Sequence, residues 1–186
     1  MPSPRLQSVR LQHDSQMVAV MPGDGDCLFS ALLHQLWGVL PGAPGHQQRV
    51  RELRGQVVRH IRRQLELDDV ERFNDWTVTI QNSILRDMPH ILPAVVDGEE
   101  QDLDLLQEQF LTLLEDGSAW GGSETLRAVA EMLDVNITLD YEHRGVASPA
   151  PLEFHPTSGP GTGQRTLQVV YRLGGPGWHQ FDSLLF

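Results

Sequence analysis

The sequence predicts an α+β fold, because segments with helical spacing come first and most segments with strand character come late. The clearest helix is residues 46–66, where apolar residues recur every three or four positions. The clearest strands, at 135–141, 166–172 and 179–185, follow the helices. With 186 residues, the chain is long enough for one domain with its own core, which we place at residues 17–186.

The segments around these elements are predicted from turn residues and apolar spacing. Residues 1–16 form a polar, partly flexible N-terminal segment, with room for one early strand. Asp75, Pro89 and Pro93 interrupt the pattern over residues 70–96, so we expect short helical pieces there. The other expected elements are a strand at 17–21, a helix at 27–37, a loop at 38–45, an acidic linker at 97–104, a helix at 102–115, a turn at 116–118, a helix at 124–133 capped by Ser123, and a mobile loop rich in Pro, Gly and Ser at 145–163.

Helix 46–66 is predicted to have an apolar face and a basic face. The apolar face carries Val50, Leu53, Val57, Val58, Ile61 and Leu65. The other face carries six arginines, Arg49, Arg51, Arg54, Arg59, Arg62 and Arg63. A run of like charges on a helix is most often a solvated face, so we expect these arginines to contact water.

Composition excludes several classes of function. The formal net charge is −11, which argues against nucleic-acid binding, because that binding depends on Lys and Arg contacting phosphates. An acidic surface suits a basic protein partner, although solubility alone explains the charge equally well. The sequence has no apolar run long enough to span a membrane, no signal-peptide pattern, and a single cysteine that allows no internal disulfide. We therefore expect a cytoplasmic monomer that binds neither nucleic acid nor membrane.

The only cysteine, Cys27, lies in a turn that reads Asp24-Gly25-Asp26-Cys27-Leu28-Phe29, between a predicted strand and a predicted helix. Free N–H groups and partial positive charge at a helix N-terminus lower the pKa of a thiol and can hold an oxyanion. The turn therefore indicates a nucleophile. The alternative is that Cys27 is a small buried apolar residue. Asp24 and Asp26 also have an alternative role as helix caps, which we prefer for Asp26.

A cysteine nucleophile needs a general base, usually a histidine, and the chain has eight. His179 differs from the others because it follows a Gly/Pro loop, opens the last predicted strand and is flanked by Trp178 and Phe181. We therefore pair Cys27 with His179, although an isolated histidine is more often structural. No Cys/His spacing suits zinc and no glycine-rich segment matches a nucleotide-binding motif, so we expect neither a metal nor a cofactor.

Three segments resemble signatures of the OTU (ovarian tumour) family of cysteine deubiquitinases. The Asp24–Phe29 turn resembles the nucleophile motif, Trp120-Gly121-Gly122 resembles the middle motif ahead of a helix, and His179 matches the histidine of the last strand. The resemblance implies a papain-like cysteine protease fold of OTU type, with a small central β-sheet packed between helices. It also implies hydrolysis of the isopeptide bond after the C-terminal Gly-Gly of ubiquitin, with ubiquitin or polyubiquitin as the partner.

The resemblance further implies how the catalytic groups would act. Cys27 would attack the isopeptide carbonyl, while His179 would accept the thiol proton and later give it to the leaving lysine amine. Backbone N–H groups of residues 24–27 would stabilise the oxyanion. Asp24 matches the acidic residue of the family's loop, and its implied role is to shape that loop.

Substrate contacts are also implied by the resemblance. Gly25 would let the turn approach the substrate closely, with Asp26 beside it. Trp178 would wall the narrow channel that admits the Gly-Gly tail. Trp120 would support the active-site region, and its alternative role is an ordinary core position.

The third catalytic residue departs from the family pattern. In the family, an Asn or Asp two residues after the histidine orients the ring, but Phe181 occupies that position here. Asp182 comes one residue later, and in a regular strand it points away from the face that His179 and Phe181 share. We rank Asp182 first, which requires a β-bulge just before it, and keep Asp24 and Asp14 as alternatives.

Two other functions remain open at this point. The departure after His179 supports a ubiquitin-binding module with weak or lost catalysis. A protease for a ubiquitin-like modifier is the other, as in some viral members of the family. If the chain is a viral or bacterial effector, its location would be the host cytosol.

Overall fold

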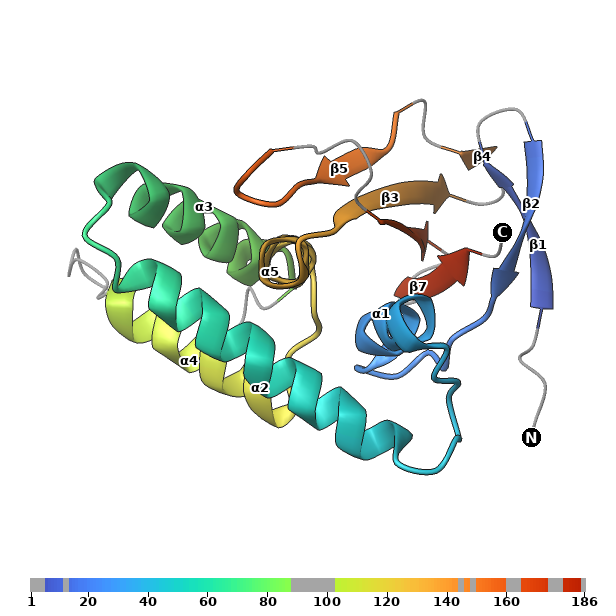
Figure 1. Cartoon of the computed structure of the whole chain (residues 1–186), viewed down its shortest axis with the longest axis horizontal. Coiled ribbons are helices and arrows are strands. Elements are labelled where there is room, and N and C mark those ends of the chain that lie inside the picture. The colour runs from blue at the N-terminus through green and yellow to red at the C-terminus, as the bar shows by residue number, and fades with distance from the viewer. Residues whose placement is uncertain are drawn as a thin grey trace, which may run out of the picture.

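The computed structural model of the chain describes residues 6–11, 14–87, 103–143, 146–147, 150–159, 165–173 and 179–184. These residues form helices and strands in the order shown in Figure 1. The helices are α1 (Cys27–Trp37), α2 (His46–Leu65), α3 (Val70–Asp87), α4 (Leu103–Asp116) and α5 (Ser123–Leu133). The strands are β1 (Leu6–Leu11), β2 (Asp14–Ala19), β3 (Asn136–His143), β4 (Val146–Ala147), β5 (Leu152–Phe154), β6 (Thr166–Leu173) and β7 (His179–Leu184).

The strands form one mixed sheet in the order β1-β2-β7-β6-β3-β4, with β5 also paired to β3. The β3–β6 pair is parallel, and the other described pairs are antiparallel. Strand β7 lies between β2 and β6. The strand that begins at His179 is therefore next to the strand that leads into the Cys27 turn, although the two are far apart in sequence.

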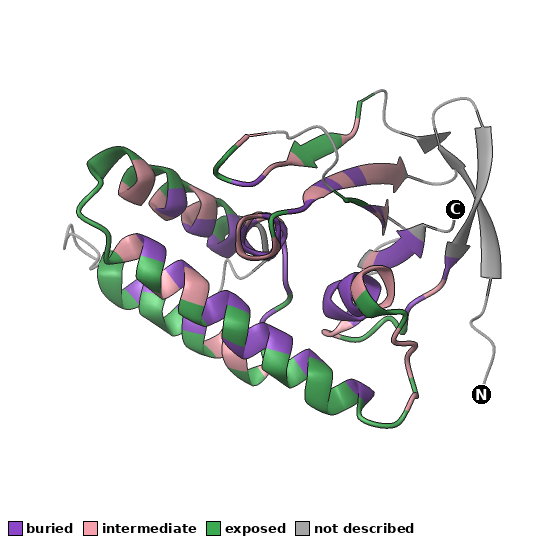
Figure 2. Cartoon of the chain, in the orientation of Figure 1, coloured by how far each residue is buried: buried purple, intermediate pink, exposed green. Residues whose placement is uncertain are grey.

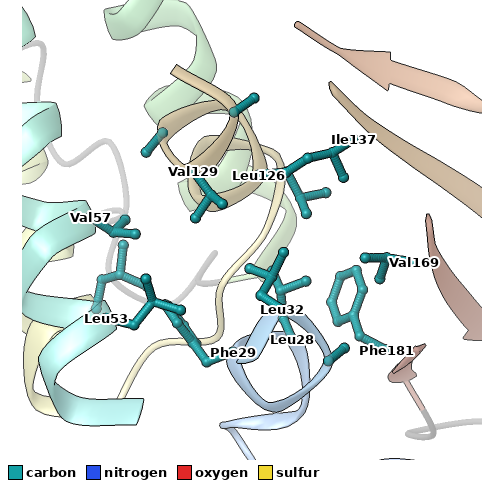
Figure 3. Close-up of a cluster of buried hydrophobic side chains, with 14 of the residues drawn as sticks. Leu28, Phe29, Leu32, Leu53, Val57, Leu126, Val129, Ile137, Val169 and Phe181 are labelled. Carbon is teal, nitrogen blue, oxygen red and sulfur yellow. The ribbon is translucent and has the colours of Figure 1, made fainter. Parts of the chain in front are cut away.

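One face of the sheet is apolar and receives two helices. In Figure 3, Ile137, Val169 and Phe181 from the sheet meet side chains of α1 and α5. The buried helix residues of this cluster include Leu28, Leu32, Leu126 and Val129. Complete burial of an aliphatic or aromatic side chain stabilises the fold by about 1.5–3 kcal/mol. Most of the stability of the contact between α1 and the sheet therefore comes from this cluster.

Helices α2, α3, α4 and α5 lie together beside the sheet, as Figure 1 shows, and α2 contacts each of the other three. Their inner faces are buried and their outer faces are exposed (Figure 2). None of the described helices is long and apolar enough to cross a membrane.

Two predictions about individual elements are wrong. Residues 70–87 form one continuous helix rather than short pieces, because Trp76, Ile80 and Ile84 make a buried stripe at helical spacing while Asp75 is exposed. Pro89 and Pro93 lie outside the described residues. Ser123 begins α5 but does not cap it.

The segments expected to be least regular also contain strands. Strand β1 lies within the N-terminal segment 1–16, and it pairs with β2 along its whole length. Strands β4 and β5 lie within the expected mobile loop 145–163 and pair with β3. These strands are too short to show an alternation of apolar and polar residues in the sequence, since β4 has two residues and β5 has three.

Candidate active site

Cys27 is the first residue of α1, as the sequence predicts, and Asp24 closes the turn in front of it. The Cys27 N–H donates to the Asp24 carbonyl at 3.2 Å, and the Asp26 N–H donates to Asp24 Oδ1 at 3.1 Å. A single residue therefore holds the turn through both its main chain and its side chain. Asp24 therefore accepts the hydrogen bonds that the N–H groups of both Asp26 and Cys27 donate.

Burial favours the protonated form of the Cys27 thiol. Its side chain is only 3% exposed, and burial raises its pKa from an ordinary value of 9.0 to about 11. Hydrogen bonds to the backbone of Phe181 and Leu28 lower the pKa, while the charges of Asp24 and Asp182 raise it further. The loss of solvation outweighs the stabilisation that the helix N-terminus offers to a thiolate.

The same contacts place Cys27 beside the strand that carries the predicted base. The Cys27 thiol interacts with the Phe181 backbone, and His179 begins the same strand two residues earlier. The backbone of His179 pairs with Leu173 of β6, and its side chain lies outside what the structure describes. Trp178 also lies outside the described residues.

The β-bulge predicted before Asp182 is absent, so the bulge is wrong, and nothing in the ladder turns Asp182 to the face of β7 that positions 179 and 181 share. The ladder runs in step from Val169↔Ser183 to Leu173↔His179, with one residue opposite one residue throughout. Strand alternation therefore puts Asp182 on the same face as Gln180, and its Oδ1 accepts a hydrogen bond of 2.7 Å from Gln180 Nε2.

The Asp182 carboxylate is completely buried and has three described partners. Oδ1 also accepts a hydrogen bond of 2.9 Å from the Met21 N–H, and Oδ2 forms an ion pair with Arg172. Burial raises the pKa of Asp182, and the hydrogen bond from Met21 and the charge of Arg172 oppose that rise only in part. Gln180 Nε2 donates to the Met21 carbonyl as well, at 2.6 Å.

Asp14, the alternative acid, starts β2 and pairs with Leu11 at the hairpin end. Ala19, at the other end of the strand, is five positions later, which is about 17 Å away at the usual rise per residue. The turn begins beyond Ala19. Asp14 is therefore remote from the nucleophile, whereas Asp24 lies in the turn itself.

Asp26 does not cap α1, contrary to our preferred prediction, and its side chain makes no capping hydrogen bond. Its Oδ1 instead accepts hydrogen bonds from Arg54 Nε at 3.0 Å and Arg54 Nη2 at 2.8 Å. Arg54 comes from α2 and is only 1% exposed. An arginine predicted to face water is thus buried against the nucleophile turn.

The burial of Arg54 can be predicted from its spacing along α2, although the run of arginines on this helix suggests a solvated position. Arg54 follows Val50 by four residues and precedes Val58 by four, so it falls on the apolar stripe of α2 and not on the opposite face. Its guanidinium also stacks over the Phe29 ring, 4.2 Å from the ring centroid. A single charged residue within an otherwise apolar stripe indicates a buried polar partner.

The Trp120-Gly121-Gly122 segment supports the turn from the other side. A Cβ on Gly121 would lie 2.9 Å from Phe29 Cε2 and 3.1 Å from Leu28 Cδ2, so only glycine fits against α1. A Cβ on Gly25 would lie 3.5 Å from the Trp120 ring, in ordinary contact. Gly25 is not among the residues with positive φ, so the turn does not need glycine for its conformation.

The start of α5 is fixed by a buried carboxylate instead of the predicted Ser123 cap. Glu124 is fully buried, and its Oε1 accepts hydrogen bonds from the Gly122 N–H at 2.7 Å and Thr125 Oγ1 at 3.0 Å. Its Oε2 accepts one from Ser83 Oγ of α3 at 2.5 Å. Within the described part of the chain, no cluster of His, Cys, Asp and Glu could hold a metal ion.

Comparison with known proteins agrees with this arrangement. The sequence profile of the OTU-like cysteine protease family matches residues 22–179. No match is found among curated proteins. Among solved structures, the OTU domain of OTUD1 is 23% identical, with a TM-score of 0.51 over 91% of this chain and 85% of that one.

Two viral structures have similar scores. The viral OTU domain protease from Farallon virus is 15% identical, with a TM-score of 0.53 over 99% of this chain and 98% of that one. The Hazara virus OTU bound to ubiquitin is 15% identical, with a TM-score of 0.52 over 98% and 95%. These likenesses confirm the α+β class and the OTU fold, and together with the profile match they show that the chain belongs to the OTU-like cysteine protease family.

Proposed function

We propose that this chain is a cysteine deubiquitinase that hydrolyses the isopeptide bond after the C-terminal Gly-Gly of ubiquitin. The observation that carries the proposal is the contact between the Cys27 thiol, at the start of α1, and the Phe181 backbone of β7, the strand that His179 opens. Family membership supports cysteine protease chemistry, and a structural neighbour from Hazara virus was solved with ubiquitin bound. Polyubiquitin is the corresponding natural partner.

The proposed reaction follows the usual course for a cysteine nucleophile. His179 accepts the Cys27 proton, and the thiolate attacks the carbonyl carbon to form a tetrahedral intermediate. The C–N bond then breaks as His179 returns the proton to the lysine amine, leaving a thioester on Cys27. Water attacks the thioester with His179 as the base, which releases ubiquitin and restores the thiol.

A thiol with a pKa of about 11 makes the base indispensable, because almost none of the thiolate exists at neutral pH without it. The oxyanion needs donors as well. We assign this role to the N–H groups of Asp26 and Cys27, which Asp24 occupies in the described state. Substrate binding would exchange Asp24 for the oxyanion, with Gly25 giving the tail close access and Trp178 walling the channel.

The proposal is tested with ubiquitin that carries a C-terminal electrophile. We expect a covalent adduct with the wild-type protein and none with Cys27→Ala, because the chain has no other thiol. We also expect the wild-type protein to cleave an isopeptide-linked diubiquitin. Binding without any adduct or cleavage would reject the enzyme in favour of a binding module, and reaction only with probes built on ubiquitin-like modifiers would change the substrate.

A second function, ubiquitin binding with weak or lost catalysis, is favoured by one observation. On strand β7 itself, the side chain that contacts Asp182 is the amide of Gln180, which has no basic nitrogen. If the catalytic base has to lie on this face of β7, the native chain lacks one.

A residue swap separates the two functions. Our proposal expects His179→Gln to abolish cleavage and the double variant His179→Gln/Gln180→His to remain inactive. Higher activity in the double variant than in the native chain would place the base at position 180 and make the native protein a binding module.

A further inference from the structure

Arg54 joins three parts of the molecule that are separate in sequence. Its guanidinium donates to the Gly25 carbonyl at 2.6 Å and twice to Asp26 Oδ1. On its other side, Nη1 donates to the carbonyls of Leu114 at 2.8 Å and Ala119 at 3.1 Å. One buried side chain of α2 therefore ties the nucleophile turn to the connection between α4 and α5.

The bond to the Gly25 carbonyl has a consequence for the adjacent N–H group. In a trans peptide, the C=O and N–H bonds point in opposite directions. Because Arg54 holds the Gly25 carbonyl toward α2, the N–H of Asp26 has to point in the opposite direction, to the side of the peptide bond away from α2. That side is where it meets Asp24 Oδ1 at 3.1 Å.

Arginine is the side chain suited to this task. Its planar fork offers five N–H donors in a fixed geometry, and all of the carbonyl and carboxylate contacts above use that fork. Lysine carries the same charge but a compact ammonium group, so it cannot reach the Gly25 carbonyl and the Leu114 and Ala119 carbonyls in the same arrangement.

We propose that Arg54 is a positioning residue for catalysis, which holds the Gly25–Asp26 peptide in the orientation that presents the Asp26 N–H to the oxyanion. This inference rests on the proposed function, in which that N–H is an oxyanion donor. Arg54 acts through the turn and touches neither the substrate nor Cys27.

The test compares Arg54→Lys and Arg54→Met with a matched control on the same helix. Arg62 also bridges α2 to α4, through Glu108 and through Glu115 at 3.2 Å, but it does not contact the turn. Arg62→Met therefore removes a cross-helix arginine without disturbing the Gly25–Asp26 peptide. Thermal unfolding identifies the folded variants, and Arg54→Lys remains informative if Arg54→Met does not fold.

Kinetics on an isopeptide-linked ubiquitin substrate separate positioning from general stability. We expect Arg54→Lys to lower kcat by about 10²-fold, the loss typical of one oxyanion donor, with KM nearly unchanged. Arg62→Met should keep the wild-type kcat. A wild-type kcat in folded Arg54→Lys, or an equal fall in Arg62→Met, would overturn the inference.

A second measurement does not depend on ubiquitin. Cys27 is buried behind the turn that Arg54 holds, so loosening the turn should speed alkylation of this single thiol by iodoacetamide by about tenfold in Arg54→Lys, through local opening. The rate in Arg62→Met should match the wild type, and equal rates in all three proteins would refute the hold on the turn. If the wild-type protein fails to cleave ubiquitin, the proposed function fails, yet the alkylation rates still decide whether Arg54 controls the turn.

Discussion

Asp182 accepts a hydrogen bond of 2.9 Å from the backbone N–H of Met21, across 161 positions of the chain. Met21 leads from β2 toward the nucleophile turn, and Asp182 lies on the strand whose backbone contacts the Cys27 thiol. The bond therefore fixes the entry to the turn against β7. Gln180 strengthens the link, because its amide donates to both the Met21 carbonyl and the Asp182 carboxylate.

Asp182→Ala should lower turnover more than Asp14→Ala. Loss of the carboxylate leaves the Met21 N–H without its acceptor and removes the ion pair with Arg172, which should also lower the free energy of unfolding by about 1–3 kcal/mol. Asp14→Ala is the matched control, since it removes an acid at the remote end of β2. Steady-state kinetics and urea unfolding measure both effects, and the reverse order of turnover would reject a role for Asp182 at the site.

The reactivity of Cys27 should depend steeply on pH. A thiol with a pKa near 11 is almost wholly protonated at neutral pH, so its alkylation rate by iodoacetamide should rise about tenfold per pH unit between pH 7 and 10. The same raised pKa stabilises the folded state below pH 9.0, and this contribution disappears as the pH rises through about 11.

Mass spectrometry follows this alkylation cleanly, because the chain has one cysteine. Cys27→Ala is the control for reaction elsewhere. A rate that is flat between pH 6 and 8 would show a thiolate already formed beside an imidazolium, and the resting state inferred from burial would then be incorrect.

Gly121→Ala should destabilise the fold more than a change at Gly25. The new methyl group at position 121 would press on the Phe29 and Leu28 side chains at 2.9 and 3.1 Å, so α5 and α1 would have to separate, at a cost of about 1–3 kcal/mol. Gly25→Ala adds the same group in ordinary contact with Trp120 and serves as the comparison. Thermal unfolding is the measurement, and equal midpoints for the two variants would contradict the close packing at Gly121.

Glu124→Gln should be destabilising although it preserves shape. The carboxylate accepts hydrogen bonds from Ser83, Gly122 and Thr125, and an amide would replace one of its two acceptor oxygens with a donor. The amide nitrogen would face Ser83 Oγ, which would have to turn its hydrogen to the Thr79 carbonyl at 3.2 Å, and the charge-assisted hydrogen bonds would become neutral ones, at a cost of about 1 kcal/mol. Ser123→Ala is the comparison, because the Ser123 side chain makes no capping hydrogen bond, and it should cost less in chemical unfolding. An effect of Glu124→Gln no larger than that of Ser123→Ala would contradict this account.

Local patterns in the sequence predict much of the fold. The start of α1 at Cys27 and the span of α2 follow from apolar spacing and turn residues, and the structure agrees at both. The α3 segment could not be predicted in this way, because the burial of Trp76 against neighbouring helices outweighs the weak helix preference of Asp75. Ser123 does not cap α5 because the helix begins at Ser123 itself and Gly122 takes the capping position, with its N–H held by Glu124 Oε1.

The candidate site, like the fold, has parts that the sequence predicts and parts that it does not. The nucleophile turn and the last strand are visible as motifs, since each is contiguous in sequence. The partners of Asp182 come from the segment after β2, from β6 and from β7, and Arg54 contacts a turn 28 residues before it, so no spacing rule reveals them. A pattern of like charges also favours a solvated face, and on α2 it hides the buried Arg54.

The buried, protonated state of Cys27 also bears on how long the protein survives in a cell. Peroxides and other oxidants attack the thiolate, and exposed cysteines of low pKa are the ones that progress to irreversible sulfinic and sulfonic acids. A side chain that is 3% exposed with a raised pKa escapes this damage until a substrate and a base draw out the proton. We therefore expect Cys27 to be oxidised slowly by peroxide and, for the same reason, to react slowly with small electrophiles.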